Sequence, residues 1–298
     1  MSKNRSEHNA PPEQYGRPLS IEDYSNRYVV HPLSDLVVKI ALPLKISANA
    51  VSVTGLLCGM LAGWFYFRQS NLIFIFAAFG LMLVWHILDG ADGRIARATQ
   101  TCSPLGRIID GVCDHLVFAS AYLGFAFYLL LLGGSQWIWL LGIVAAASHA
   151  FQAAAYEERR QKYHRRTRGL VRKKIAANLT QIDGKKSALA KAYDILQKLS
   201  ASRTSKLDTL LASPKIASDP KTVASLVKQT VPVVRAWALL NANNRTIMLA
   251  VFALLGKPAL YFWYEIIILN LLFAGLIIFE KIRENSIVTK FTSQLDQS

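Results

Sequence analysis

The chain has 298 residues, of which 52% are hydrophobic and 18% are charged, and its mean hydropathy is +0.27. This composition is apolar-rich and charge-poor for a soluble globular domain, and it excludes an intrinsically disordered chain. A formal net charge of +15 is compatible with nucleic-acid binding, anionic lipid or the charge asymmetry of a membrane protein. The positions of the charges along the chain decide among these classes.

The N-terminus and the cysteines lead to two further expectations. The chain opens on a polar stretch rather than on a basic segment followed by an apolar run, so we expect no cleaved signal peptide. The three cysteines, Cys58, Cys102 and Cys113, form no CxxC pair and no metal-ligand spacing. We therefore expect no disulfide framework.

Six apolar stretches of the kind that crosses a bilayer lie along the chain. They cover residues 51–67, 72–88, 108–132, 137–156, 233–256 and 259–279. We predict an all-α integral membrane protein with six transmembrane helices and both termini on the cytoplasmic side. In that orientation the outer turns hold only Arg68 and Lys257 of the 34 basic residues, as the positive-inside rule requires. This asymmetry explains most of the net charge without nucleic acid.

A shorter segment, residues 34–46, precedes the first span and mixes Leu, Val and Ile with Asp35, Lys39 and Lys45. It is too short and too polar to cross, so we predict an amphipathic helix in the membrane interface. The alternative is an ordinary solvent-exposed cap on the bundle. The predicted organisation is a cytoplasmic segment at 1–48, four spans at 49–156, a basic cytoplasmic insertion at 157–232, and two spans with a tail at 233–298.

The insertion opens on a dense run of basic residues. These are Arg159, Arg160, Lys162, Arg165, Arg166, Arg168, Arg172, Lys173 and Lys174. Two interpretations stay open for them, namely docking on anionic lipid and a solvated positive-inside surface. Farther along, we expect a helix over 185–199 and breaks at Ser213-Pro214 and Asp219-Pro220.

The most informative stretch carries four aspartates around the inner ends of the second and third spans. It reads Asp89-Gly90-Ala91-Asp92-Gly93-Arg94-Ile95-Ala96-Arg97 and continues with Gly106, Asp110 and Asp114. On a helix, Asp89, Asp92, Gly93 and Ala96 share one face, and Gly106, Asp110 and Asp114 share a face of the next helix. We therefore expect two carboxylate stripes to face each other between the helices.

These carboxylates predict a cation between the two stripes. Four acidic side chains at membrane depth repel one another strongly unless a positive charge lies among them. Carboxylate oxygens suit hard cations such as Mg²⁺ or Mn²⁺, and a two-metal site is a common partner of phosphate chemistry. Two alternatives are that the small residues only let the helices pack closely, and that the carboxylates form the coupling-ion site of a transporter.

The same residues resemble the signature of the CDP-alcohol phosphotransferase (CDP-alcohol phosphatidyltransferase) family. That signature is DxxDGxxAR, eight residues and then GxxxDxxxD, and the chain matches every fixed position of it. The motif covers 26 residues, and eight fixed positions at fixed spacing make it highly specific. The six-span layout and the amphipathic N-terminal helix also resemble the family, whereas the insertion departs from its compact pattern.

The resemblance implies transfer of a phosphoalcohol unit from a CDP-linked donor to an acceptor hydroxyl, with release of CMP and formation of a phospholipid. It implies that Asp89, Asp92 and Asp110 hold two divalent cations, Mg²⁺ or Mn²⁺, on the donor pyrophosphate. Asp114 would complete the metal site or accept the proton of the acceptor hydroxyl. The active site would open on the cytoplasmic side.

The resemblance also implies a nucleotide pocket. Residues matched to it are Gly93, Ala96, Arg97 and Gly106 of the motif, together with Asn49, Ser52 and Thr54 at the start of the first span. The family usually has Pro before that Asn, and this chain has Ala48. The alternative for Asn49 is that it simply caps the helix.

Two branches of the family remain open for the substrate. One uses CDP-diacylglycerol and a polar acceptor, and the other uses a CDP-linked head group and a lipid hydroxyl. Ser103-Pro104-Leu105-Gly106 and Tyr24-Ser25-Asn26 resemble the choline and ethanolamine branch. The six spans are fewer than that branch usually has. His115 stands where Arg or Lys is common in enzymes that accept a phosphorylated polyol.

The fifth span suggests an acceptor pocket, because its uninterrupted apolar part, residues 246–256, has only 11 residues. Eleven residues cover about 16 Å of the roughly 30 Å of hydrocarbon, so the preceding polar turns must enter membrane depth. We predict that this pocket includes Arg235, Asn241, Asn243, Asn244 and Arg245. The alternative is a tilted helix whose Arg245 reaches the interface. His86 and His149 are candidates for contacts behind the metal ligands.

Two other functional classes compete with the transferase. An ion-coupled or lipid transporter would use the carboxylate cluster as a cation site, and a non-catalytic scaffold would recruit partners through the insertion. The expected partners are the two substrates and membrane lipids, with anionic lipid at the insertion and a second copy in a homodimer as further options. We expect no nucleic acid.

Overall fold

The computed structural model describes residues 20–102, 104–168 and 205–295, and it describes no side chains for residues 103–110. Within this part all regular secondary structure is helical. Six of its helical stretches are long and apolar enough to cross a membrane, which confirms the predicted fold of a multi-pass integral membrane protein. The first four are α2 (Ala48–Phe67), α3 (Leu72–Ala98), α4 (Pro104–Leu131) and α5 (Trp137–Thr167).

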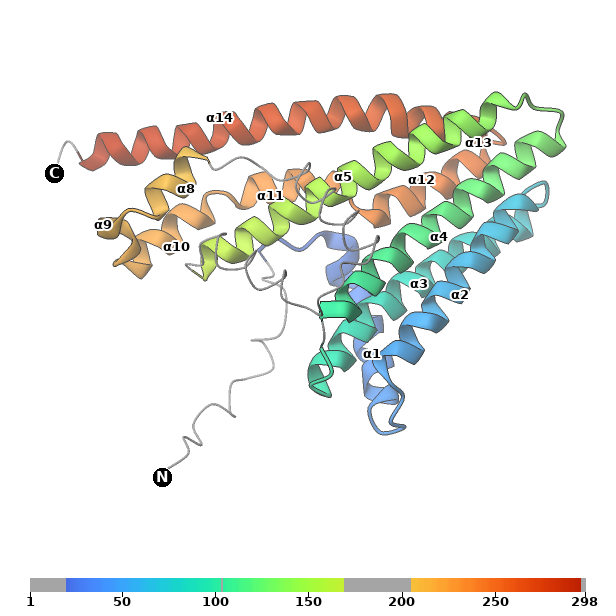
Figure 1. Ribbon diagram of the computed structural model, residues 1–298, viewed down its shortest axis with the longest axis horizontal. Coiled ribbons are helices and arrows are strands. Elements are labelled where there is room, and N and C mark those ends of the chain that lie inside the picture. Colours follow the sequence, from blue (N-terminus) through green and yellow to red (C-terminus); the bar gives the residue numbers. More distant parts are fainter. Residues whose placement is uncertain (1–19, 103, 169–204, 296–298) are drawn as a thin grey trace, which may run out of the picture.

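Helices α2, α3 and α4 lie side by side in one half of the molecule (Figure 1). A close crossing of α2 and α4 depends on two glycines, since a Cβ atom on Gly124 would clash with the carbonyl oxygen of Gly63. Beside this crossing, Tyr66, Met82 and Phe125 are completely buried in the main hydrophobic core. The packing holds the two helices that carry the motif, α3 and α4, against the same helix α2.

A short helix precedes the spans, as predicted. The chain forms a π-helical turn, η2 (Asn26–Val30), and then α1 (His31–Ala41). The buried hydroxyl of Ser34 donates to the carbonyl of Ile87 in α3 at 2.8 Å, and Arg94 of α3 forms an ion pair with Asp35. Apolar side chains such as Ile40, which is 53% exposed, point outward. An interfacial position for α1 agrees with this exposure and stays a prediction.

The fifth span is interrupted. It consists of α10 (Pro220–Lys228), α11 (Val231–Trp237), the 3₁₀ turn η3 (Ala238–Leu240) and α12 (Ala242–Leu254). Asn241 caps α12 by accepting a hydrogen bond from the backbone N–H of Asn244 at 2.9 Å. The two predicted breaks are confirmed, because α9 (Pro214–Ala217) and α10 each begin at a proline. Helix α8 (Lys206–Leu211) precedes them.

The sixth span consists of α13 (Pro258–Trp263), a π-helical turn η4 (Tyr264–Ile268) and α14 (Leu269–Leu295). Both α5 and α14 extend well beyond the apolar stretches predicted from the sequence, so α5 continues through the expected boundary between residues 156 and 157. Figure 1 shows α14 running across the molecule, from α13 in the span region to α8 at the other end. The helix expected over 185–199 lies outside the described residues.

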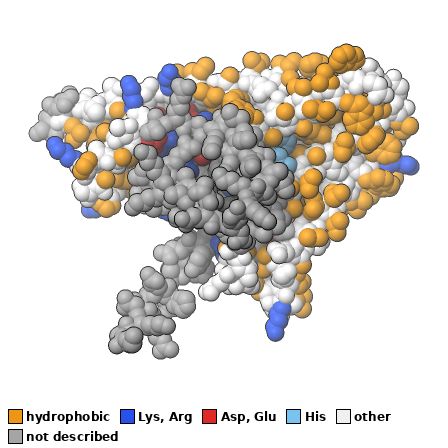
Figure 2. All heavy atoms as spheres, viewed as in Figure 1, with side chains coloured by type: hydrophobic (Ala, Val, Ile, Leu, Met, Phe, Trp, Pro, Cys, Tyr) orange, Lys and Arg blue, Asp and Glu red, His pale blue; other side chains and the backbone are white. Residues whose placement is uncertain are grey.

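Apolar side chains cover the outside of the spans. In Figure 2 they gather over the part of the molecule that contains α2, α4, α5 and α13 in Figure 1. Leu57, Leu131, Ile143 and Leu271 are each at least 60% exposed in the isolated chain. Such a surface is stable only against lipid or another apolar partner, which supports the membrane assignment.

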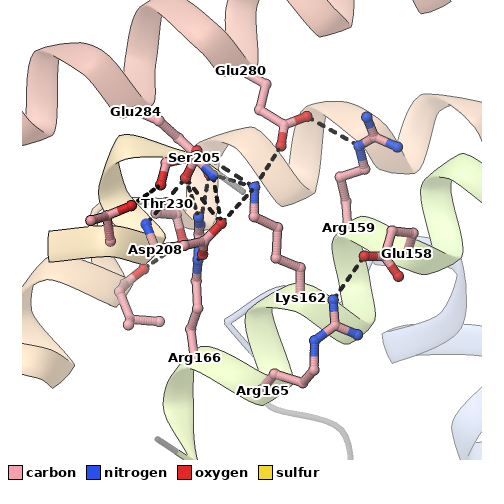
Figure 3. Close-up of polar contacts among 12 residues, drawn as sticks. Glu158, Arg159, Lys162, Arg165, Arg166, Ser205, Asp208, Thr230, Glu280 and Glu284 are labelled. Carbon is pink, nitrogen blue, oxygen red and sulfur yellow. Dashed lines mark hydrogen bonds and ion pairs between the residues drawn. The ribbon is translucent and has the colours of Figure 1, made fainter. Parts of the chain in front are cut away.

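An ion-pair cluster joins the extensions of α5 and α14 to α8 (Figure 3). Arg159, Lys162 and Arg166 lie on one face of α5 and are 6–9% exposed. They contact Glu280 and Glu284 of α14 and Asp208 of α8, at N–O distances of 2.7–3.8 Å. Arg159 also lies 4.1 Å from the ring centroid of Trp237. These residues of the basic run are therefore engaged inside the protein rather than forming a solvated surface.

We expect Arg166→Met to weaken the attachment of α8 and α14 to α5. Arg166 contacts Glu284 and Asp208 at 2.7 and 2.8 Å. Its loss removes one of the cations that balance these two carboxylates inside the cluster. A partner removed from a buried pair costs about 3–5 kcal/mol, and we expect about 3 kcal/mol because Asp208 is partly exposed. Thermal unfolding in detergent measures the loss. Arg168→Met, at an exposed position, is the matched control, and equal stability of the two variants would contradict the assignment.

The same cluster makes the stability of the fold depend on pH through Asp208 of α8. Burial opposes ionisation of Asp208, but Arg166, Lys162 and the backbone N–H of Ser205 together hold the pKa of its carboxyl below the ordinary value. A depressed pKa stabilises the fold above the unfolded-state pKa, and this contribution is lost as the pH falls through the folded-state pKa. We expect the thermal stability of the wild type to fall with acidification below the ordinary Asp range. Asp208→Asn should remove part of that dependence.

Candidate active site

Helix α3 carries the first half of the motif in a single unbroken helix that begins after the capping residue Asn71. Asp92 is buried, with 7% exposure, and Asp89 is half-buried three residues earlier. The hydroxyl of Ser52, on α2, donates a hydrogen bond to Oδ2 of Asp92. The structure therefore brings together one predicted metal ligand and one residue of the predicted nucleotide pocket, which lie 40 positions apart in the sequence.

The other two predicted residues at the start of α2 are exposed. The Thr54 hydroxyl donates to the carbonyl of Ala50 at 2.8 Å, and Thr54 lies on a different face of the helix from Ser52. Asn49 does not cap the helix, because Ser47 does so by accepting from the N–H of Ala50 at 3.2 Å. The alternative assignment of Asn49 as the cap is thus wrong. Its role at the nucleotide stays a prediction.

Near the end of α3, the side chain of Arg97 covers the backbone of Gly93. A Cβ atom at Gly93 would lie 3.4 Å from Nη1 of Arg97, so the Arg97 guanidinium lies over this glycine. Ala96, one residue before Arg97, is half-buried. The small residues and the arginine of the motif thus form one continuous patch beside the carboxylates. Its use by a nucleotide is a prediction that the geometry leaves open.

Helix α4 carries the second half of the motif. Gly106 and Asp110 lie in the stretch without described side chains, whereas Asp114 is described and half-buried. Among the described side chains, no three carboxylates, imidazoles or thiols form a group that could hold a metal ion. Asp110, one of the four predicted carboxylates, lies outside the described side chains. The donor set of carboxylate oxygens, one of them buried at Asp92, fits a hard divalent cation by its chemistry.

Arg245, predicted to border the acceptor, is buried in the bundle with 1% exposure. Its Nε donates to Oε1 of Glu265 at 3.0 Å, and its Nη2 donates to Oε1 of Gln152 at 2.6 Å. The alternative in which Arg245 reaches the interface is therefore wrong, and the prediction that polar groups enter the bundle agrees with this burial. The guanidinium is, however, already bound by protein groups.

The other residues of the predicted acceptor pocket bind the N-terminal segment or the preceding turn η3. Arg235 donates to the carbonyl of Ser20 at 2.8 Å, and Asn241 donates to Asp23 at 2.7 Å. Asn243 contacts Ser25 at 2.7 Å and Asn26 at 2.8 Å. Asn244 lies within 3.3 Å of the carbonyls of Ala238 and Leu239. An acceptor would have to replace these contacts, so the assignment of the pocket stays a prediction.

A buried polar network that sequence reasoning missed surrounds Arg245. Tyr261 donates to Glu265 at 2.7 Å, the Tyr261 and Tyr122 hydroxyls lie 3.3 Å apart, and Tyr122 contacts Nδ1 of His149 at 3.0 Å. Glu265 is 0% exposed and lies in the π-helical turn η4. A lone acidic residue in an apolar span was the available signal, since such a charge needs a buried partner.

His86, a candidate for a contact behind the metal ligands, contacts α12, a helix that carries none of the motif. Its Nε2 lies 2.9 Å from the hydroxyl of Thr246 on α12. His86 is 6% exposed and Thr246 is 0% exposed. This contact joins α3, one turn before Asp89, to the C-terminal half of the chain.

Comparison with known proteins agrees with the motif. The profile of the CDP-alcohol phosphatidyltransferase family matches residues 45–182, which contain α2, α3, α4 and the whole carboxylate motif. The predicted resemblance to this family is thus confirmed over residues 45–182, which are 138 of the 298 residues. The matched residues begin just before α2 and include every fixed position of the motif.

Similar members of the family have different substrates in their names. Choline/ethanolaminephosphotransferase 1 of Arabidopsis thaliana is 29% identical over 128 residues, covering 41% of this chain and 33% of that protein. Archaetidylinositol phosphate synthase of Pyrococcus horikoshii is 32% identical over 83 residues, covering 28% and 42%. CDP-diacylglycerol–serine O-phosphatidyltransferase of Helicobacter pylori is 34% identical over 79 residues, covering 26% and 32%. The chain thus matches about a third of the length of the plant relative.

Proposed function

We propose that the protein is a metal-dependent CDP-alcohol phosphotransferase that makes a phospholipid and releases CMP. The observation that carries the proposal is the complete family motif on α3 and α4, with Asp92 buried against Ser52 at the start of α2. The reaction class is common to the relatives named choline/ethanolaminephosphotransferase and CDP-diacylglycerol–serine O-phosphatidyltransferase. The prediction of an active site and termini on the cytoplasmic side belongs to this proposal, supported by the distribution of basic residues.

In the proposed reaction, the oxygen of the acceptor hydroxyl attacks the phosphorus of the transferred phosphoalcohol. The new P–O bond replaces the bond to CMP, which leaves with the bonding electron pair, and Asp114 takes the proton of the hydroxyl if it acts as the base. Asp89, Asp92 and Asp110, with Asp114 as a further ligand, would hold two cations, Mg²⁺ or Mn²⁺. When bound, these cations neutralise pyrophosphate charge and stabilise the leaving group.

Ser52 on α2 would hold the Asp92 carboxylate in position through its hydrogen bond. Arg97 would contribute a positive charge to the nucleotide phosphates beside Gly93 and Ala96. Gly106, Asn49 and Thr54 complete the proposed nucleotide pocket. For the acceptor we propose Arg235, Asn241, Asn244 and Arg245, which would exchange their present protein contacts for contacts with the acceptor.

The choice of alcohol needs an experiment, because named relatives come from both branches. Purified protein is given a panel of CDP donors, including CDP-diacylglycerol, CDP-choline and CDP-ethanolamine, with matching acceptors and Mg²⁺ or Mn²⁺. CMP release and the lipid product are both measured. CMP release that depends on metal and acceptor supports the proposal. Cation-coupled transport without CMP release in any donor–acceptor pair would instead support the transporter.

We expect Asp114→Asn to distinguish a base from a metal ligand. Asparagine keeps the size of the side chain and one carbonyl oxygen but cannot accept the hydroxyl proton. If Asp114 is the base, donor affinity stays near the wild-type value and turnover falls by about 10²–10⁴-fold. Donor affinity is measured by CDP binding with Mn²⁺, and turnover by CMP release. Parallel loss of both quantities would show that Asp114 is better described as a ligand.

A further inference from the structure

One polar contact links the aspartate helix α3 to a part of the chain outside the family match. Nε2 of His86 and the Thr246 hydroxyl lie 2.9 Å apart, and both side chains are buried. The match ends at residue 182, so α12 and Thr246 lie beyond it. A buried imidazole and hydroxyl that pair across two helices restrict how those helices slide and rotate against each other, because either group loses free energy without its partner.

The position of His86 makes this restriction relevant to the carboxylates. His86, Asp89 and Gly93 are spaced i, i+3 and i+7, so they lie on one face of α3. The His86 ring is packed 4.3 Å from that of Trp85, centroid to centroid, and Trp85 in turn packs edge-to-face on Phe118 of α4 at 5.5 Å. The imidazole therefore has little freedom to find another partner if Thr246 is lost.

The other side of the contact is anchored just as firmly. Arg245, the neighbour of Thr246, binds Glu265 of η4 at 3.0 Å and Gln152 of α5 at 2.6 Å. Gln152 also donates to Asn270 of α14 at 2.8 Å. The start of α12 is thus held by α5, η4 and α14 at the residue next to the one that contacts α3. The position of Thr246 relative to α3 is therefore fixed by these contacts.

We propose that His86 and Thr246 are positioning residues that set the rotation of α3 and so direct Asp89 and Asp92 toward the cations of the proposed function. The inference rests on that function. It adds that a residue outside the family-matched segment, Thr246, helps to orient the aspartates. Carboxylates bind a metal well only when the positions of their oxygen atoms are held within a fraction of an ångström. Groups behind the ligands commonly change metal affinity or activity by about 10–100-fold when removed.

The test compares four proteins for Mn²⁺ affinity in the presence of CDP, measured by electron paramagnetic resonance, and for CMP release. Thr246→Val removes the hydroxyl at constant shape, and we expect Mn²⁺ affinity to fall about 10–100-fold. Thr246→Ser keeps the hydroxyl and should restore most of the affinity. Thr230→Val is the matched control, since Thr230 is 2% exposed and its hydroxyl donates to the carbonyl of Val227 in the neighbouring turn at 2.6 Å.

A double-mutant cycle separates positioning from general loss of packing. We expect His86→Leu to lower Mn²⁺ affinity about as much as Thr246→Val, and the double variant to lose little more, because the two changes remove one interaction. If Thr246→Val binds Mn²⁺–CDP with the same affinity as the wild type, this inference is overturned and the proposed function is not. Additive losses, or equal losses in Thr230→Val, also overturn it. A wild type that neither binds Mn²⁺–CDP nor releases CMP overturns the proposed function and this inference with it.

Discussion

Replacement of Asp89, Asp92 or Asp110 by alanine is expected to abolish transfer while leaving an assembled protein. Each change removes a carboxylate that would hold the cations and balance the charge of its neighbours. We expect CMP release to fall by at least about 10²–10³-fold, the loss that removal of one electrostatic contact causes in other enzymes. The measurement is CMP release at saturating donor and acceptor, normalised to protein that elutes as a folded species in detergent.

Asp35→Ala is the matched control for these variants. It removes an aspartate that also contacts α3, through Arg94, but that lies on α1 and is largely exposed. We expect it to retain most of the activity, because exposed ion pairs contribute little to stability. Substantial turnover in any one of the three motif variants would refute the two-metal assignment. A wild type without turnover, together with partner recruitment that is unchanged in all three variants, would support the non-catalytic scaffold.

Arg245→Met is expected to cause the largest loss of stability among the residues outside the motif. The guanidinium and the carboxylate of Glu265 are 1% and 0% exposed as side chains, so removal of the cation leaves an uncompensated charge in the bundle. Breaking such a pair from one side costs about 3–5 kcal/mol. Replacement of both residues, Arg245→Met with Glu265→Met, should cost less than Arg245→Met alone. Thermal unfolding in detergent measures the order of stabilities.

The same variants test the acceptor assignment. Arg235→Met is the control, since Arg235 is exposed and donates only to the carbonyl of Ser20 in the described contacts, and we expect it to cost at most about 1 kcal/mol. Kinetics at a temperature where all variants are folded give the KM values for donor and acceptor. A selective rise in the acceptor KM of Arg245→Met would support an acceptor site. Equal KM values would leave Arg245 with a structural role, and a stability equal to the wild type would contradict the buried pair.

Local sequence patterns were sufficient for the number of spans and for the motif. Apolar stretches near bilayer length predict helices from hydrophobicity alone, and the structure has six candidate spans close to those positions. The spacing of Asp89, Asp92 and Gly93 predicts a shared face because helical periodicity depends only on the local backbone. The starts of α9 at Pro214 and α10 at Pro220 are also local, because proline lacks the N–H that a preceding helix would need and is tolerated in the first turn.

Hydropathy was a poor guide to the ends of α5 and α14. Residues 157–167 are too polar for a span, yet they continue α5 because Arg159, Lys162 and Arg166 find carboxylates on α14 and α8. These partners lie 42–122 positions away in the sequence. A charge pattern does not tell a solvated surface from a buried ion-pair cluster when the opposite charges are so distant, because both carry the same local composition.

The sequence by itself determined the fold class, the six spans, the resemblance to the family and the residue types of the candidate site, since these follow from composition, periodicity and a motif of fixed spacing. Only the tertiary structure decided which polar groups meet. The contacts Ser52–Asp92, His86–Thr246 and Arg245–Glu265 each join different helices, and the first two span 40 and 160 positions. Burial at membrane depth makes every such group require a partner, but packing of the helices selects which partner it has.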